Sequence, residues 1–317
     1  MSNTVINRPK SAGKLRRTLR ECVKYRGLLI LLIPSFIWFI LFKYAPMYGV
    51  VVSFKDYKAR RGILGSAWAS PLFKYYIKLF NNPYFWKVFR NTLEISLIKI
   101  LFTFPAPIIF ALMLNEVQNI HFKKVIQTIT YLPHFISWVI VAALMTTLLS
   151  PVNGVVNDII EVFGGQRVSF LMTPGWFRPL LVLSSMWKGI GWGSIVYLAA
   201  ITGIDPTVYE AADIDGANRL RKIWSITIPS ILPVISIMFI LRMGDIMNGG
   251  FDQVVNLYNS FTYDVGDILD TYAYRIGLEK FEYSNSTAIS FLKNTIGLIM
   301  VLITNGITRK MGGDGVV

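Results

Sequence analysis

The sequence predicts an all-α, polytopic membrane protein with six transmembrane helices. Hydrophobic residues make up 53% of the 317-residue chain and charged residues only 16%, whereas soluble domains carry about 25% charged residues. The apolar residues gather in six runs, each near the roughly 20 residues that a helix needs to cross a bilayer. The single cysteine, Cys22, excludes a disulfide framework within the chain, and no Cys/His spacing typical of a metal site is present.

The six apolar runs differ in their charged and proline residues. We expect spans at residues 27–50, 91–115, 125–149, 179–203, 223–244 and 288–308. Pro105 and Pro107 are expected to bend the second span, because proline lacks the backbone N–H and crowds the preceding turn. The third run carries no charge, whereas the fourth contains Lys188. Six spans place both termini on one side of the membrane, with lipid around most of the chain.

The strongly basic balance, a net charge of +14, is typical of cytoplasmic membrane loops and does not indicate a nucleic-acid partner. Residues 1–26 hold eight basic residues and one acid. They are not a signal peptide, because the apolar run that follows is too long and no small-residue cleavage site closes it. We therefore expect residues 1–26 to be a basic cytoplasmic tail.

The distribution of Lys and Arg sets the expected orientation. With the N-terminus inside, the inner segments hold fifteen basic residues and the outer segments twelve, eight of which lie in the first outer loop, 51–90. Because the tail dominates insertion of the first span, we expect both termini in the cytoplasm and the chain in the plasma or inner membrane. The transmembrane domain is then 27–310, with a cytoplasmic loop at 204–222 and a short C-terminal tail at 311–317.

The loop after the fourth run carries clear helix boundaries. Asp205 suits the N-cap position and Pro206 the first helical position, where a missing N–H costs nothing. Asp215-Gly216 marks the end, because glycine tolerates the left-handed conformation that closes many helices. The sequence therefore predicts a helix over 206–214 and a second helix that starts near Ala217 and continues into the fifth run.

The most specific pattern in the sequence lies in the same segment. Glu210-Ala211-Ala212 is followed by three residues, Gly216, nine residues, Ile226, one residue and Ile228-Pro229. This resembles the EAA loop of ABC-importer permeases, in which Leu is usual at the position of Ile228. The resemblance implies that Glu210 to Ala217 form a coupling helix inserted into a cleft of an ATPase subunit. The implied coupling residues are Tyr209, Glu210, Ala211, Ala212, Asp215, Gly216, Ala217, Ile226 and Pro229.

Four other segments resemble the carbohydrate branch of the same family, and most closely permeases for oligosaccharides derived from complex polysaccharides. They are KYAPMYGVVVSFKDY, NTLEISL, YLPHFISWVI and GGFDQVVNLYN. The resemblance implies a second, related permease, two ATPase subunits that bind ATP and Mg²⁺, and an extracytoplasmic solute-binding lipoprotein. This chain itself is expected to bind no cofactor or metal and to catalyse no reaction. Alternating access driven through the coupling helix would import the carbohydrate.

Polar residues in or beside the apolar runs are candidates for the solute path, because a charge in hydrocarbon is costly unless it faces a polar interior. The candidates are Trp187, Lys188, Trp192, Arg242, Asp245, Asn248, Asp252 and Gln253. The two tryptophans suit stacking on sugar rings, or else plain packing. Arg242 and Asp245, three residues apart, suit either the path or a structural ion pair.

Three further patterns concern packing and helix boundaries. The glycines of residues 189–193 favour close approach of neighbouring helices. The segment 263–278 predicts one external helix with Ile268, Tyr272 and Ile276 on one face. Gly249-Gly250 is expected to break any helix that continues from the fifth run.

Two other classes of membrane protein remain as alternatives. A membrane-embedded enzyme would need convergent catalytic residues, but the sequence contains no hydrolase elbow, metalloprotease motif or phosphate loop. An ion-coupled secondary transporter would need inverted repeats, and residues 27–149 and 179–308 show no convincing similarity to each other.

Overall fold

The computed structural model describes residues 24–310, so most of the predicted N-terminal tail and all of residues 311–317 lie outside the described part. Within it the chain is helical, without a β-strand, and a single isolated bridge joins Lys55 to Trp68. The elements, with η for short 3₁₀ or π segments, are α2 (Arg26–Phe39), η1 (Ile40–Tyr44), α3 (Ala45–Met47), η2 (Tyr48–Phe54), η3 (Ala59–Arg61), α4 (Gly62–Gly65), α5 (Lys74–Phe80), α6 (Pro83–Thr103), α7 (Pro105–Asn115), α8 (Ile120–Tyr131), η4 (Leu132–Phe135), α9 (Trp138–Leu148), α10 (Val155–Val162), α11 (Pro174–Thr202), α12 (Pro206–Ile214), α13 (Arg219–Lys222), η5 (Ile223–Thr227), α14 (Ile228–Gly244), α15 (Phe251–Leu257), α16 (Tyr263–Gly266), α17 (Leu269–Tyr274), η6 (Arg275–Glu279) and α18 (Tyr283–Lys310).

Four of the predicted spans correspond to helices long and apolar enough to cross a membrane. These are Arg26–Phe54, Pro83–Asn115, Arg219–Gly244 and Tyr283–Lys310. The predicted fourth span lies in α11, which is 29 residues long but is not among the helices apolar enough for this group. The number of spans supported by length and composition is therefore four, or five if the bent pair described next counts as one.

The prediction of one continuous helix at 125–149 is wrong. α8 with η4 and α9 meet at an angle of 103°. Pro133 removes a backbone donor at this point, and Ile136 is extended. Ser137 then caps the new helix by accepting a hydrogen bond from the Ile140 N–H at 3.4 Å. The third apolar run is thus a broken helix.

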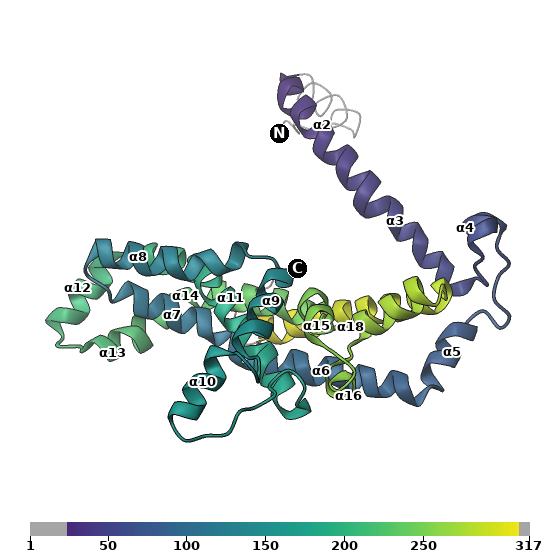
Figure 1. Cartoon of the computed structure of the whole chain (residues 1–317). Helices are drawn as coiled ribbons and strands as arrows, with labels where there is room; N and C mark the ends of the chain where they lie inside the picture. The colour runs from purple at the N-terminus through teal and green to yellow at the C-terminus, as the bar shows by residue number, and fades with distance from the viewer. Residues whose placement is uncertain (1–23, 311–317) are drawn as a thin grey trace, which may run out of the picture.

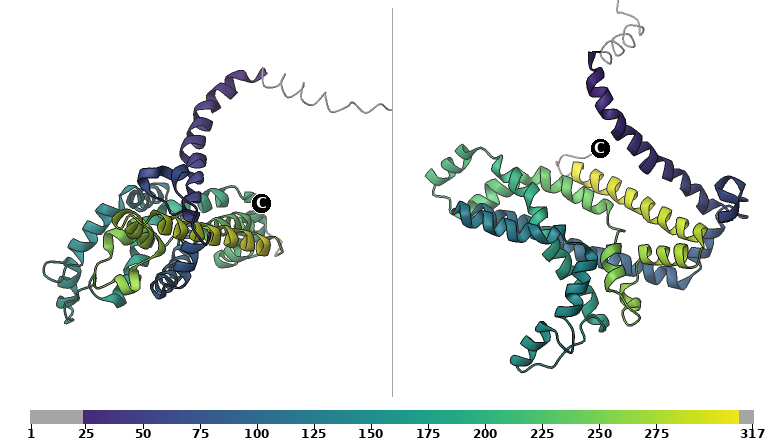
Figure 2. Two further views of the ribbon diagram at one scale, coloured as in Figure 1. Left: turned by 90° about the vertical axis from the view of Figure 1, so that its right-hand side faces the viewer. Right: turned by 45° about the horizontal axis from the view of Figure 1, so that its top comes forward.

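The elements form an elongated bundle (Figure 1). α12 and α13 lie at one end and α4 and α5 at the opposite end, with α6, α11, α14 and α18 between them. The helix formed by α2, η1 and α3 stands apart from the bundle in all views (Figures 1 and 2), and the 18-residue apolar stretch that qualifies it as a span has no buried residue. Its apolar side chains are therefore left for lipid or for another chain.

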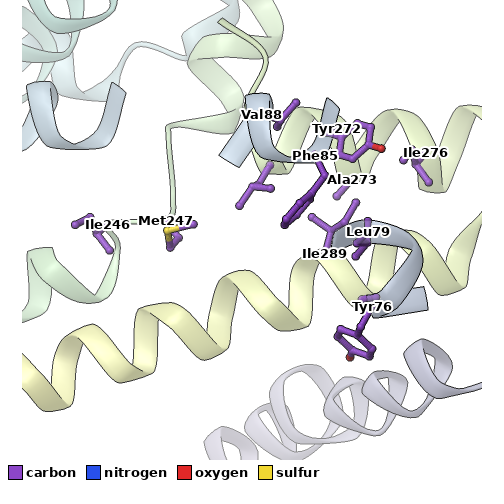
Figure 3. Packing of buried hydrophobic residues seen from close by; sticks show 12 residues of the cluster. Tyr76, Leu79, Phe85, Val88, Ile246, Met247, Tyr272, Ala273, Ile276 and Ile289 are labelled. Atoms are coloured by element: carbon purple, nitrogen blue, oxygen red, sulfur yellow. The ribbon is translucent and has the colours of Figure 1, made fainter. Parts of the chain in front are cut away.

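The largest buried cluster joins α5, α6, α17 and α18 to the segment that follows α14 (Figure 3). Phe85 and Ile289 are each 1% exposed at its centre. The predicted apolar face of Ile268, Tyr272 and Ile276 is confirmed as buried. The helix expected over 263–278 is divided into α16 and α17, however, because Asp267 and Ile268 are extended between them.

Glycines in α11 bring neighbouring helices close together, as predicted. A Cβ atom added at Gly191 would lie 2.2 Å from the Thr130 carbonyl oxygen of α8, and one at Gly193 would lie 3.0 Å from the Pro107 ring of α7. A Cβ at Gly189 meets nothing within 4 Å. Gly191 therefore permits the contact between α11 and the broken helix.

We predict that Gly191→Ala lowers the stability of the protein in detergent, whereas Gly189→Ala does not. Both changes remove the conformational freedom of a helical glycine, which favours alanine by about 1 kcal/mol, but only the first forces a methyl group onto backbone atoms. Overpacking of this kind costs about 1–3 kcal/mol. The measurement is the thermal unfolding midpoint of each purified variant, and equal midpoints would contradict the prediction.

Candidate functional site

The first candidate site is the exposed loop around α12. The predicted helix over 206–214 is confirmed, with the Asp205 carboxylate accepting the Thr207 N–H at 3.0 Å. This hydrogen bond holds the pKa of Asp205 below its usual range. Gly216 has a φ of +73°, a conformation that L side chains rarely adopt. The helix therefore ends where the sequence predicted.

Two side-chain contacts join α12 to the helix that follows it. The Tyr209 and Thr227 hydroxyls lie 2.8 Å apart, and the Lys222 ammonium lies 2.7 Å from the Asp213 carboxylate. The second helix, predicted from near Ala217, begins at Arg219 after Asn218 caps it, and continues through η5 into α14. α12 is thus attached to a helix of 26 residues.

The outer face of this loop is open to the surroundings. No residue of α12 is buried, and Glu210, Ala211 and Asp215 are exposed. Ile214 and Leu220 are 88% and 69% exposed. The exposed apolar side chains of Ile214 and Leu220 share this loop with the exposed carboxylate of Glu210. Such a surface is suited to contact with another protein.

The second candidate site is a cavity of about 550 Å³ in the middle of the bundle, which we call the central cavity. It is enclosed by α6, α7, α9, α11, α14 and the chain that follows α14. Six of the eight predicted path residues line it: Lys188, Trp192, Arg242, Asp245, Asn248 and Gln253. Trp187 and Asp252 do not line it.

Lys99 and Gln253 form a buried polar hub beside the central cavity. The Lys99 ammonium donates to the Gly249 carbonyl at 2.7 Å and to the Gln253 side-chain oxygen at 2.5 Å. The Gln253 amide donates to the Leu181 carbonyl and the Ser184 hydroxyl of α11. Because Gln253 is 1% exposed and its amide nitrogen and oxygen are both bonded, it serves to hold α6, α11 and α15 together.

Lys188 also has protein partners. Its ammonium donates to the carbonyls of Pro133, His134 and Ile136 at the bend between α8 and α9. The ring of His134 stacks on Trp192 with centroids 4.6 Å apart. Lys188 thus satisfies carbonyl groups that the broken helix leaves free.

Arg242 and Asp245 do not form the alternative ion pair considered from the sequence, because within residues 24–310 neither has a charged partner within 4.0 Å. Arg242 makes one side-chain hydrogen bond, to the Thr103 hydroxyl at 3.3 Å. Its guanidinium has five donors, so most of them remain available at the cavity wall.

The sequence analysis missed several residues of this wall, including Thr103, Trp138, Ser185 and Tyr197. A periodic signal was present in α11, since Ser185, Gly189, Trp192 and Val196 recur at helical spacing and all line the cavity. No such signal marks Trp138, because it reaches the cavity wall only through the bend in the third apolar run, which the sequence analysis did not predict.

The comparisons with known proteins agree on one family. Residues 103–311, about two thirds of the chain, match the binding-protein-dependent transport system inner membrane component. The chain is 44% identical to the polygalacturonan/rhamnogalacturonan transport system permease protein YteP of Bacillus subtilis, over 96% of this chain and 94% of YteP. It is 42% identical to protein LplB of Bacillus subtilis, over 96% of this chain and 95% of LplB.

The fold is also similar to that of a solved transporter. A crystal structure of a bacterial alginate ABC transporter, in complex with an alginate pentasaccharide-bound periplasmic protein, contains a chain that matches with a TM-score of 0.86 and 41% identity. The match covers 95% of this chain and 100% of that chain. The family, YteP and the alginate transporter are each described by transport and not by a catalysed reaction. The chain therefore belongs to the family of binding-protein-dependent transport system inner membrane components and is a permease subunit of an ABC importer.

Proposed function

We propose that this permease imports oligosaccharides that carry carboxylate groups, through the central cavity. The observation that carries the proposal is Arg242, a cation at the cavity wall that has no acidic partner among residues 24–310. Lys99 and Lys188 add positive charge, and Trp138 and Trp192 offer aromatic surface for sugar rings. The names of two similar proteins, for polygalacturonan/rhamnogalacturonan and for alginate, point to acidic polysaccharides.

The proposed driving force reaches the cavity from α12. A short helix held to the start of α14 by Tyr209 and Thr227 suits the transmission of a rigid-body displacement. Closure of an ATPase dimer on α12 would tilt α11 and α14 and open the cavity outward, which is alternating access. Glu210 offers a charge for an arginine of the ATPase, and Gly216 a turn in which a side chain would be strained.

The partners follow from this mechanism. We expect a second, homologous permease subunit, two ATPase subunits that hold ATP and Mg²⁺, and an extracytoplasmic solute-binding lipoprotein. ATP hydrolysis then takes place on chains other than this one.

The proposed topology has six spans, with α8 and α9 together as the third and α11 as the fourth. Both termini and residues 204–222 lie in the cytoplasm. The position of α12 at the end of the bundle opposite α4 and α5 (Figure 1) supports this arrangement.

We predict that Arg242→Gln reduces uptake of galacturonate oligosaccharides by the reconstituted importer. A hydrogen bond to a charged group contributes about 1.5–3 kcal/mol, so uptake efficiency should fall roughly 10- to 150-fold. The control is Arg60→Gln, which removes an exposed cation distant from the cavity. Unchanged uptake by Arg242→Gln would remove the basis for a carboxylated substrate.

We predict that Glu210→Lys abolishes uptake while the protein remains in the membrane, because it places a cation where the ATPase is expected to present one. The control Glu279→Lys reverses an exposed charge in η6 and should leave uptake intact. Uptake and co-purification of the ATPase are measured together. Uptake that survives ATP depletion, but is lost with the ion gradient, would instead identify a secondary transporter.

We predict that Cys22, the single cysteine, reacts with a membrane-impermeant maleimide in inside-out vesicles and not in intact spheroplasts. A variant with Cys22→Ser and Arg60→Cys should show the opposite pattern, because residue 60 belongs to the first outer loop. Labelling of both positions from one side would overturn the proposed orientation.

A further inference from the structure

A second cavity, of about 440 Å³, lies at the end of the molecule opposite α12, and we call it the outer pocket. It is formed where the α5–α6 junction meets α17, η6 and the start of α18. It shares no lining residue with the central cavity. Lys99 follows Asn82 by 17 residues along α6, which at about 1.5 Å per residue separates the two cavities by roughly 25 Å.

Three tyrosines give the outer pocket aromatic surface. The rings of Tyr84 and Tyr272 lie 5.3 Å apart, and the Arg275 guanidinium lies 5.4 Å from the Tyr263 ring. Tyr272 is held in the buried cluster with Leu79 and Ile276 (Figure 3), while Tyr84 and Tyr263 are 36% and 37% exposed. Fixed aromatic faces that are partly open to solvent suit the apolar face of a pyranose ring.

The outer pocket also contains a buried acceptor without a partner. Asn285 is 4% exposed, and its amide nitrogen donates to Glu282. Its side-chain oxygen makes no hydrogen bond within the described part of the chain, residues 24–310, which is costly for a buried polar atom. A hydroxyl group from a sugar in the pocket would supply the missing donor.

One of the three cations that line the outer pocket has no ion-pair partner within residues 24–310. Arg275 is neutralised by Asp267 at 2.6 Å, and Lys78 pairs with Glu282 at 3.2 Å. Lys280 is exposed and, within residues 24–310, has no acidic group within 4.0 Å. This balance suits a single carboxylate.

We propose that the outer pocket is a second binding site for a pyranose residue of an acidic oligosaccharide, occupied before the sugar reaches the central cavity. The Tyr84 and Tyr263 rings would contact the sugar ring with Tyr272 packed behind Tyr84, the Asn285 side-chain oxygen would accept a hydrogen bond from a sugar hydroxyl, and Lys280 would pair with the carboxylate. The proposal rests on the proposed function, since it takes the substrate to be a carboxylated oligosaccharide. It adds a binding site on the outer loops.

The test is calorimetric binding of trigalacturonate to the complete transporter in nanodiscs, without the binding protein. Tyr263→Ala and Lys280→Gln should each weaken binding to the outer pocket roughly tenfold, equivalent to one decade in Kd. Matched controls are Phe261→Ala, which removes an exposed aromatic ring two residues away, and Arg60→Gln. In Arg242→Gln, binding to the central cavity should be lost and binding to the outer pocket should remain. Adding Tyr263→Ala to this variant should remove the remaining binding.

Wild-type affinity in both pocket variants, with normal uptake by the wild-type importer, would overturn the second site and leave the proposed function intact. Maltotriose binding as tightly as trigalacturonate would overturn the assignment of Lys280. Absence of trigalacturonate uptake by the wild-type importer would instead overturn the proposed substrate class. Recovery of the assembled complex at wild-type yield shows that each variant is folded.

Discussion

The arrangement of the bundle depends on the buried ammonium of Lys99. A charge in a low-dielectric interior must be compensated, and here the compensation comes from the Gly249 carbonyl and the Gln253 side chain. Gly250 has a φ of +90°, a conformation that L side chains rarely adopt, and a Cβ there would lie 2.7 Å from this ammonium. The break after α14 thus provides the acceptors for the charge of α6, and the two features meet at one wall of the central cavity.

Lys188 solves a related problem on the opposite side. The bend between α8 and α9 leaves carbonyl groups without helical partners. The Lys188 ammonium from α11 donates hydrogen bonds to these carbonyls. Lys99 and Lys188, two of the three cations at the central cavity, thus donate their hydrogen bonds to other groups of the protein. Arg242 differs from them, because its one side-chain bond is to a hydroxyl. In the proposed function, selection of a charged solute would therefore depend mainly on Arg242.

Local signals predicted the helix ends well. Asp205, Pro206 and Gly216 specify α12 within its own sequence, so its bounds followed without tertiary information. Pro133 and the Ser137 N-cap are local features of the 103° bend, but the Lys188 ammonium that bonds to its carbonyls comes from more than fifty residues away, and no local pattern records that contact. Helix geometry explains why one predicted tryptophan lines the central cavity and the other does not. Trp187 and Trp192 are five residues apart on α11, which is about 140° around the helix, so only one of them faces the cavity.

α12 and Arg242 are connected through a single helical segment. Thr227, which contacts Tyr209 of α12, and Arg242 belong to one continuous helical segment, Arg219–Gly244. Fifteen residues separate them, or about 22 Å of helix. In the proposed mechanism, a movement imposed at α12 would reach the cavity wall along this one continuous segment, which contains Pro229 and Pro233. The π segment η5 and Pro229 lie at the end of this segment that is nearer to α12, so in the proposed mechanism a change of helix angle there would move Arg242 together with the rest of α14.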